Sequence, residues 1–473
     1  MLDLPANAIA RLIRNREVSV SELMENTLRR ADEVQARFNA FVTIAHDSAL
    51  LQAQQADRAI SDASPESLPE LFGVPFSVKD LLDTQGVRTT YGSRAFAENV
   101  PQTDIIAVAR MREAGAILIG KTTTSEFASS VLTDSPLSGV TRNPWNPELS
   151  PGGSSGGAGV AAATGSGTIA ISTDGGGSSR IPGAACGVLG LKGTLGAIPH
   201  ESWPFHFGNN SSISMNSRFP EDLITAFNVM AGAHRMDPWS RRPVSRLRTP
   251  ADPGQAVEGR RAIFIPAMGG NVVDRAYMAI VKRALEGLEA AGLRVEIADT
   301  DPTDFDPSMA THMIACNLAA RMRAFPAEQQ ELLGPVLARL LDEERYKPDG
   351  VRVQAGAISR SRAYDRLETL LQDYDLVLSP TLTAVPPLAE PNGDPCVLIN
   401  GEEASIDKWW SHLSLANMTG HPAISVPCGA DADGLPVGLH AIAGWDREQE
   451  LIDLASAMST AESWIDKSRT VDS

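Results

Sequence analysis

The chain has 473 residues and is acidic, with 41 Lys and Arg against 58 Asp and Glu and a net charge of -17. This charge would repel a phosphate backbone over most of the surface, so nucleic acid is not expected as a partner. Hydrophobic residues make up 43% and charged residues 21%, which is ordinary for a globular protein and excludes a disordered or fibrous chain.

The cysteines and the N-terminal segment bear on the cellular compartment. Four cysteines lie far apart without a C-x-x-C pair, so neither a disulfide framework nor a structural zinc site is expected: Cys186, Cys316, Cys396 and Cys428. The N-terminus lacks the continuous apolar core of a signal peptide, and no window approaches the ~20 apolar residues of a membrane span. We therefore expect a cytoplasmic protein with no membrane contact.

The first expected elements are helices, followed by strands. Ser19 and Glu22 form an S-x-x-E capping box, and about residues 1–65 are expected to be a helical N-terminal segment. Further along, the short apolar runs VPFSV, AILIG and GTIAIS alternate with Gly, Pro, Ser and Asn, which is typical of buried strands and turns. The segment of about 66–240 is expected to carry the chemistry.

The second half predicts further alternation of strands and helices. The run AIFI at 262–265, a helix over 273–291 ending at Gly292, and the run LRVEIA indicate a strand–helix–strand unit. A helical part follows over about 300–373, and then YDLVLSPT and PAISVPCG predict more buried strands. This alternation of strands and helices favours an α/β fold. Because the sequence contains no internal repeat and no long linker, residues 1–473 are expected to form one large domain.

Residues 150–180 hold two Gly/Ser clusters on either side of an Ala/Gly stretch that fits a closely packed helix. Glycine lets the backbone approach a ligand closely. Backbone N–H groups and serine hydroxyls suit a serine nucleophile with oxyanion stabilisation. A flexible linker is the alternative, but strand-like runs flank and interrupt the clusters, so a reaction site is the preferred interpretation.

Two short motifs offer other functions. GAILIGKT at 115–122 satisfies the P-loop pattern of nucleotide-binding proteins, but its variable positions are strand-like, so Lys121 is expected to be structural. GSSGG at 153–157 satisfies the nucleophile elbow of α/β-hydrolases, which needs a later acid and a later His. His421 and His440 are candidates for that His, although no acidic partner stands out.

Several blocks, in order along nearly the whole chain, resemble the amidase signature family of serine hydrolases. They are GVPFSVKDLLDT at 73–84, GKTTTSEFA at 120–128, NPWNPELSPGGSSGG at 143–157, TDGGGSSRIPGAACGVLGLKGT at 173–194, and GHPAISVPCG with GLPVGL near 420–439. Such an ordered series is far more specific than any one motif. The resemblance implies a single large α/β domain with a central twisted mixed β-sheet covered by helices on both faces.

The resemblance also implies a catalytic triad and its mechanism. Ser178 corresponds to the nucleophile, Ser154 to the bridging serine after a cis peptide bond from Gly153, and Lys79 to the base. Lys79 must be buried and neutral, so its pKa must fall from about 10.4 towards 7. Ser178 would form an acyl-enzyme that water hydrolyses, while the relay returns a proton to the leaving nitrogen. No metal or other cofactor is implied.

Other residues of the same blocks would support the triad. The expected oxyanion hole consists of backbone N–H groups of Gly175, Gly176, Gly177 and Ser178. Ser155, Thr173, Asp174 and Arg180 match supporting positions, with Asp174 and Arg180 expected to pair. The chain departs from the family pattern at Gly175, Ser179 and Gly193, which predicts a looser nucleophile loop.

Substrate recognition is expected from less typical segments, at 129–139, 200–212 and the helix around 314–322. Candidate pocket residues are Ser129, Ser130, Trp203, Phe205 and Phe207, although the aromatics equally fit core packing. A small-molecule amide is expected, and an aryl amide, a carbamate (urethanase activity) or an ester all remain open. A glutaminase-type subunit of an amidotransferase complex is the alternative, and the choice between monomer and homodimer stays open.

Overall fold

The fold is built on a mixed sheet of 11 strands in the order β1-β3-β2-β6-β8-β7-β14-β15-β11-β9-β10. The computed structural model describes residues 2–62, 64–201, 206–342, 350–391 and 395–461. The strands are β1 (Phe41–Ile44), β2 (Pro75–Lys79), β3 (Ile117–Thr122), β6 (Ile169–Asp174), β7 (Leu189–Lys192), β8 (Ser212–Ser217), β9 (Arg261–Phe264), β10 (Arg294–Ile297), β11 (Leu376–Pro380), β14 (Ala423–Ala430) and β15 (Pro436–Ala443). Two small hairpins lie outside this sheet: β4 (Asp134–Ser135) with β5 (Gly139–Val140), and β12 (Cys396–Ile399) with β13 (Glu402–Ser405).

Strand direction decides which side chains meet at the sheet edge. β2 is parallel to both β3 and β6, with Val78 opposite Ile171, whereas β6 and β8 are antiparallel. The carboxyl ends of neighbouring parallel strands lie on the same side of a sheet. Lys79, at the end of β2, therefore lies beside the end of β6 and its residue Thr173.

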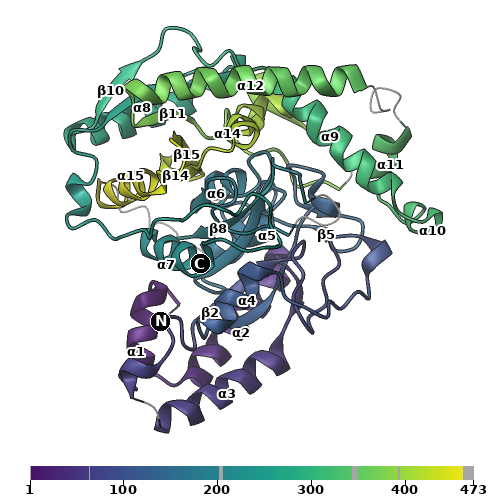
Figure 1. The fold of residues 1–473 in the computed structure, drawn as a ribbon, viewed down its shortest axis with the longest axis vertical. Coiled ribbons are helices and arrows are strands. Elements are labelled where there is room, and N and C mark those ends of the chain that lie inside the picture. The colour runs from purple at the N-terminus through teal and green to yellow at the C-terminus, as the bar shows by residue number, and fades with distance from the viewer. Residues whose placement is uncertain (1, 63, 202–205, 343–349, 392–394, 462–473) are drawn as a thin grey trace.

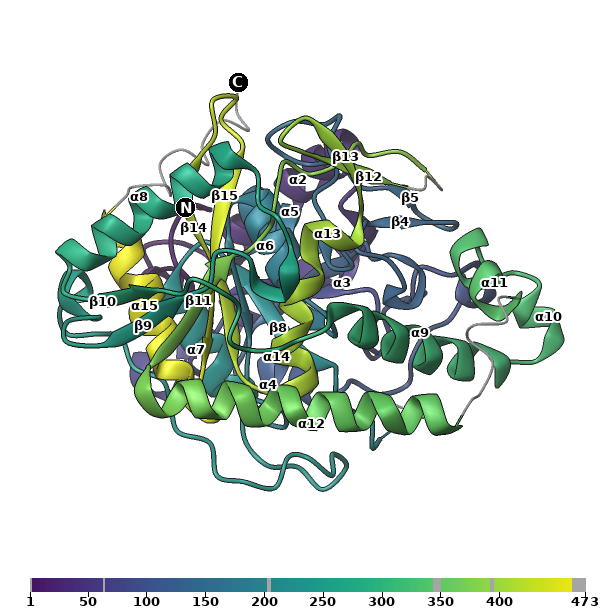
Figure 2. The ribbon, with the colours of Figure 1, turned by 90° about the horizontal axis from the view of Figure 1, so that it is seen from above.

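Helices cover both faces of the sheet, as expected. Figure 2 shows α8 (Arg275–Ala290) and α15 (Glu448–Ala461) on one face of β14 and β15, with α5 (Gly156–Ala163) and α6 (Arg180–Cys186) on the other. α5 packs directly against α6: a Cβ added at Gly159 would lie 2.8 Å from the Cβ of Pro182. Small residues in the Ala/Gly stretch therefore permit this close packing, which a flexible linker would not need.

The N-terminal segment is helical except for one strand. It contains α1 (Ala6–Arg14), α2 (Val20–Phe38) and α3 (His46–Asp62), at one end of the molecule in Figure 1. Ser19 caps α2 by accepting a hydrogen bond from the Glu22 N–H at 3.0 Å, which confirms the predicted start of this helix. The strand β1 was not predicted, and its antiparallel pairing with β3 places it at the sheet edge.

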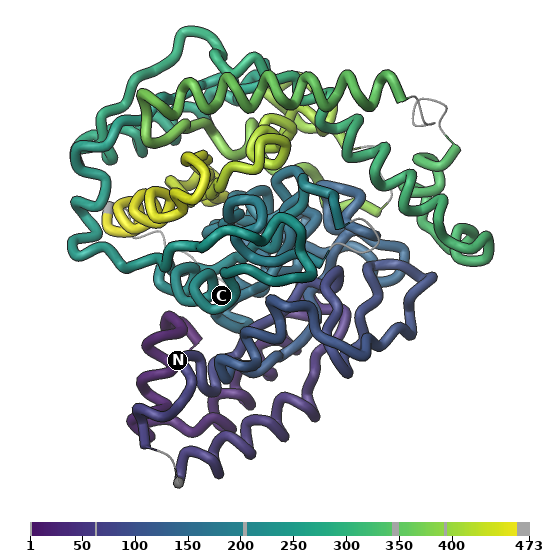
Figure 3. The backbone as a smooth tube through the Cα atoms, in the orientation of Figure 1, coloured from purple at the N-terminus to yellow at the C-terminus, as the bar shows by residue number. Residues whose placement is uncertain are grey.

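The helical part predicted over about 300–373 contains α9 (Pro307–Arg323), α10 (Ala327–Gln330), α11 (Pro335–Asp342) and α12 (Gly350–Asp373). Figure 3 shows α12 at the opposite end of the molecule from the N-terminal helices. The remaining α-helices are α4 (Ile106–Glu113), α7 (Pro220–Met230), α13 (Asp407–Trp410) and α14 (Ser414–Thr419). Across the described ranges, none of the helices is long and apolar enough to span a bilayer.

Candidate active site

Lys79 ends β2 with a fully buried side chain. Its Nζ donates hydrogen bonds to Ser154 Oγ at 2.7 Å and to Thr173 Oγ1 at 3.0 Å. Burial lowers the pKa of Lys79 from its ordinary 10.5 to about 7, because the charged amine loses its hydration, while the negative charge of Asp174 acts in the opposite direction. A large fraction of the amine is therefore neutral at physiological pH, as the sequence predicted.

The backbone around Ser154 is tightly held. The Gly153–Ser154 peptide bond is cis, as the resemblance implied. Thr133 Oγ1 donates to Gly152 O at 2.8 Å and accepts from the Gly156 N–H at 2.9 Å, so one side chain bridges the two ends of this turn. A Cβ added at Gly153 would lie 2.8 Å from backbone carbon of the neighbouring chain segment, which explains the need for glycine.

Ser178 lies in the turn between β6 and α6 and is half-buried. Ser178 and Ser154 both line one cavity. The Ser155 N–H donates to the Ser178 carbonyl at 3.3 Å, and Ser155 Oγ donates to the Thr173 carbonyl at 3.1 Å. The two Gly/Ser clusters of the sequence therefore lie side by side. Ser155 links them through its N–H group and its hydroxyl, which both donate to backbone carbonyls.

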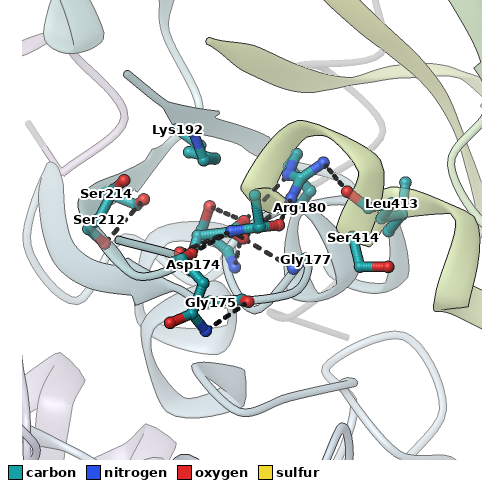
Figure 4. A network of polar contacts seen from close by, with 12 residues as sticks. Asp174, Gly175, Gly177, Arg180, Lys192, Ser212, Ser214, Leu413 and Ser414 are labelled. Atoms are coloured by element: carbon teal, nitrogen blue, oxygen red, sulfur yellow. Dashed lines mark hydrogen bonds and ion pairs between the residues drawn. The ribbon is translucent and has the colours of Figure 1, made fainter. Parts of the chain in front are cut away.

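Asp174 fixes the turn that carries Ser178 (Figure 4). Its carboxylate accepts hydrogen bonds from the Gly177 N–H at 2.7 Å, from Ser179 Oγ at 3.0 Å, and from Arg180 Nε and Nη2 at 3.0 and 2.9 Å. Burial alone would raise the pKa of Asp174, but the Arg180 guanidinium holds it well below its usual range. The expected pair of Asp174 and Arg180 is confirmed. Ser179, expected to loosen the turn, instead adds a hydrogen bond to it.

One predicted oxyanion donor is already occupied. The Gly177 N–H donates to Asp174 Oδ1, so it is not available to a substrate. Within the described part of the chain, the N–H groups of Gly175, Gly176 and Ser178 donate to no protein acceptor, and these three residues line the cavity. The predicted oxyanion hole therefore loses Gly177. The three remaining backbone N–H groups are suited to stabilise negative charge that develops on a substrate carbonyl oxygen.

Three residues that the sequence did not place at this site surround Arg180. Arg180 Nη2 donates to Asn417 Oδ1 at 2.6 Å, and Nη1 donates to Leu413 O at 2.9 Å and contacts His440 Nε2 at 2.9 Å. Asn417 Nδ2 in turn donates to the Asp174 carbonyl at 2.9 Å. Burial, followed by the Arg180 charge, keeps the pKa of His440 well below its ordinary value. The sequence offered His440 only as a histidine for the nucleophile elbow, and no motif marks Asn417 or Leu413.

The cavity has a volume of about 490 Å³ and opens over Ser154 and Ser178. All three segments expected to recognise substrate contribute to its wall, at 129–131, at 208–211 and from α9. Ser129 and Ser130 lie in this wall. The apolar part of the wall includes Leu81, Phe127, Val131, Ile314, Leu318, Ile406 and Trp410.

The three predicted pocket aromatics have different outcomes. Phe207 is wrong as a pocket residue: its side chain is 73% exposed and is not among the described residues of the cavity wall. Its neighbour Gly208 lines the cavity instead. Trp203 and Phe205 lie outside the described residues.

The P-loop interpretation is wrong. Residues 117–122 form strand β3, and Lys121 is buried. Lys121 Nζ donates to Thr84 Oγ1 at 2.8 Å, to Thr89 Oγ1 at 2.9 Å and to the Leu82 carbonyl. The lysine is therefore structural, because its three donors are used within the protein rather than on a phosphate.

The nucleophile-elbow interpretation also fails on geometry. Its serine would be Ser155, whose Oγ donates to a backbone carbonyl. His421 contacts Glu368 Oε1 at 2.9 Å and Thr419 Oγ1 at 2.9 Å, and His440 contacts Arg180 and Ser379. Both imidazoles thus have other partners than this serine.

Comparison with known proteins settles the family. The model of the family described as Amidase matches residues 22–452. The chain belongs to the amidase family. It is 33% identical to an acylamidase of Rhodococcus erythropolis, over 98% of this chain and 96% of that relative. It is also 33% identical to a glutamyl-tRNA(Gln) amidotransferase subunit of Synechococcus sp. (strain WH7803), over 95% of each chain.

A solved structure supports the same assignment for this amidase. A bacterial aryl acylamidase of the amidase signature family superposes with a TM-score of 0.89 and 28% identity, covering 98% of both chains. The amidase signature fold predicted from the sequence is therefore confirmed. The protein is a hydrolase of carbon–nitrogen bonds other than peptide bonds.

Proposed function

We propose that this amidase hydrolyses a small-molecule acyl amide through an acyl-enzyme on Ser178, with Ser154 and Lys79 relaying protons. The 2.7 Å contact between Lys79 Nζ and Ser154 Oγ, at the wall of a cavity that Ser178 shares, supports this proposal most directly. A buried lysine with a pKa of about 7 is suited to general-base catalysis at neutral pH.

In the proposed reaction, Ser178 Oγ attacks the amide carbonyl while Ser154 Oγ takes its proton and passes its own proton to Lys79. The carbonyl oxygen becomes negatively charged and accepts hydrogen bonds from the N–H groups of Gly175, Gly176 and Ser178. The relay then protonates the leaving nitrogen, and the C–N bond breaks. Water, deprotonated by the same relay, hydrolyses the ester on Ser178 and restores the free serine.

An acyl amide, with an aryl amine as a favoured leaving group, is the substrate class we propose. Two relatives support it by name, the acylamidase and the aryl acylamidase. The cavity of about 490 Å³, with its apolar walls, suits a small molecule. Carbamates and esters present a similar carbonyl to Ser178, and their hydrolysis stays a prediction from the sequence, as does location in the cytoplasm.

A glutaminase-type subunit is the second candidate, because the glutamyl-tRNA(Gln) amidotransferase relative is as similar in sequence as the acylamidase. The two functions differ in what the isolated chain can do. An acylamidase hydrolyses an acyl anilide as a purified chain, whereas a subunit of an amidotransferase works together with partner proteins. Turnover of an anilide by the purified chain would favour the first candidate, and co-purification with partner proteins would favour the second.

Labelling with a serine-directed fluorophosphonate tests the proposed nucleophile. Intact mass should show a single adduct on the native chain and none on Ser178→Ala. Ser179→Ala is the matched control, since it changes the adjacent serine in the same turn and should keep the adduct. An adduct on Ser178→Ala, or none on the native chain, would contradict the assignment of Ser178.

A further inference from the structure

Arg321 brings a positive charge into the wall of the cavity. It lies in the last turn of α9, is half-buried, and lines the cavity together with Arg339 of α11. Within the residues that the structure describes, the Arg321 guanidinium has neither a hydrogen-bond acceptor nor a carboxylate partner. A half-buried guanidinium that faces a cavity loses part of its hydration without gaining a counter-ion, which suits an arginine whose partner is supplied by a ligand.

The neighbours of Arg321 do not neutralise its charge. Burial lowers the pKa of Arg321, and the group that acts against this is the phenol of Tyr91, which is neutral at physiological pH. The Tyr91 hydroxyl donates to Asp83 at 2.6 Å, so that carboxylate is occupied by the phenol. Among the described residues that line the cavity, the acidic one is Asp407, which lies in α13 and is exposed to solvent.

The positive charge also lies close to the proposed reaction centre. Burial, followed by the positive charges of Arg321 and Lys79, lowers the pKa of His200 to about 4. Arg321 lines the same cavity as Ser154 and Ser178, so the guanidinium faces the space in which the substrate would react. Because His200 is neutral at physiological pH, it adds no charge of its own.

A purely structural role for Arg321 is less suited to these observations. A cation in the last turn of a helix interacts favourably with the helix dipole. Arg323, in the same turn, already serves this role, and its Nη2 donates to the Leu341 carbonyl at 3.1 Å, which ties α9 to α11. Arg321 differs because its guanidinium lines the cavity.

We propose that the substrate carries a carboxylate on the part that fills this cavity, and that Arg321 binds it. This proposal rests on the proposed function and names the substrate class: amides of dicarboxylic or other acidic acyl groups. The planar guanidinium suits a two-point contact with a carboxylate. The apolar wall accommodates the intervening carbon chain, and Arg339, exposed at the rim, attracts the anion to a protein whose net charge is -17.

Two anilides of similar shape test the proposal. Succinyl-4-nitroanilide carries a carboxylate, and butyryl-4-nitroanilide is its neutral counterpart. The ratio of their kcat/KM values should fall about 10- to 100-fold in Arg321→Met, the range for loss of a charge-assisted contact. Arg323→Met is the matched control on the same turn and should keep the wild-type ratio. An unchanged ratio in Arg321→Met would overturn the proposal.

A binding measurement separates failure of this proposal from failure of the proposed function. Glutarate at millimolar concentration should raise the Tm of the wild type and of Ser178→Ala, but not of Arg321→Met, because ligand that binds the folded state stabilises it. Neutral glutaramide should have a smaller effect on the wild type. No glutarate shift in the wild type would overturn the anion site even if both anilides are hydrolysed, whereas turnover by Ser178→Ala would overturn the nucleophile alone.

Discussion

Replacing Lys79 by Met should inactivate the amidase and at the same time stabilise its fold. Wild-type Lys79 is fully buried, and its pKa falls from 10.5 to about 7 on folding. Below about pH 7 the folded protein must hold this amine in its charged form without hydration. A shift of this size corresponds to about 5 kcal/mol of lost stability at such pH values.

Methionine fills a similar volume and removes that cost, but it also removes two hydrogen bonds. The hydroxyls of Ser154 and Thr173 would lose their contacts with Nζ, at about 1 kcal/mol each. The net expectation is a free energy of unfolding about 3 kcal/mol higher for Lys79→Met at about pH 6. Loss of the proposed general base should lower kcat by about 10²- to 10⁴-fold.

The sign of the pH dependence makes the experiment decisive. Between about pH 7 and 10.5 the unfolded chain binds the Lys79 proton and the folded chain does not, so the wild type gains stability as pH rises. Urea unfolding of both proteins should therefore show the advantage of Lys79→Met shrinking by about 3 kcal/mol between about pH 6 and about pH 9. Lys121 and Lys192, whose pKa values burial also lowers, titrate in both proteins and cancel in the difference.

Lys282→Met, at an exposed position of α8, is the control for removing a lysine charge elsewhere. The free energy of unfolding of Lys282→Met, relative to that of the wild type, should be the same at about pH 6 and about pH 9. Two results together would refute the idea that the buried, charged Lys79 amine destabilises the fold. Lys79→Met would be no more stable than the wild type at about pH 6, and the difference in their free energies of unfolding would not change with pH. Wild-type kcat/KM should also fall about tenfold per pH unit below about pH 7.

Two further substitutions test the packing of the site. Asp174→Asn leaves the buried Arg180 guanidinium without its counter-ion and should lower the free energy of unfolding by about 3–5 kcal/mol; an unchanged urea midpoint would contradict the buried pair. Gly190→Ala would place a Cβ 2.4 Å from the Ser179 carbonyl, so overpacking should cost about 1–3 kcal/mol and, by displacing the turn, should lower kcat. Thermal unfolding and anilide turnover check the second, and a variant with both unchanged would show that the turn adjusts freely.

Local sequence patterns predicted much of the fold because they depend on neighbours along the chain. Apolar runs bounded by Gly and Pro predicted β2, β3 and β6, and the capping box predicted the start of α2 at Ser19. The ordered blocks identified Lys79, Ser154 and Ser178 as the residues to examine. The strand β1 was missed, since a run of four residues between two helices gives too weak an alternation to stand out.

The sequence by itself therefore determined the family, the α/β class and the residues whose chemistry suits amide hydrolysis. Only the tertiary structure decided that the Gly177 amide serves Asp174 and that Asn417 holds Asp174 and Arg180. It also decided that Arg321 lines the cavity while Phe207 faces solvent. These contacts join segments far apart in the chain, and their geometry depends on how the sheet and its covering helices pack, which no local pattern encodes.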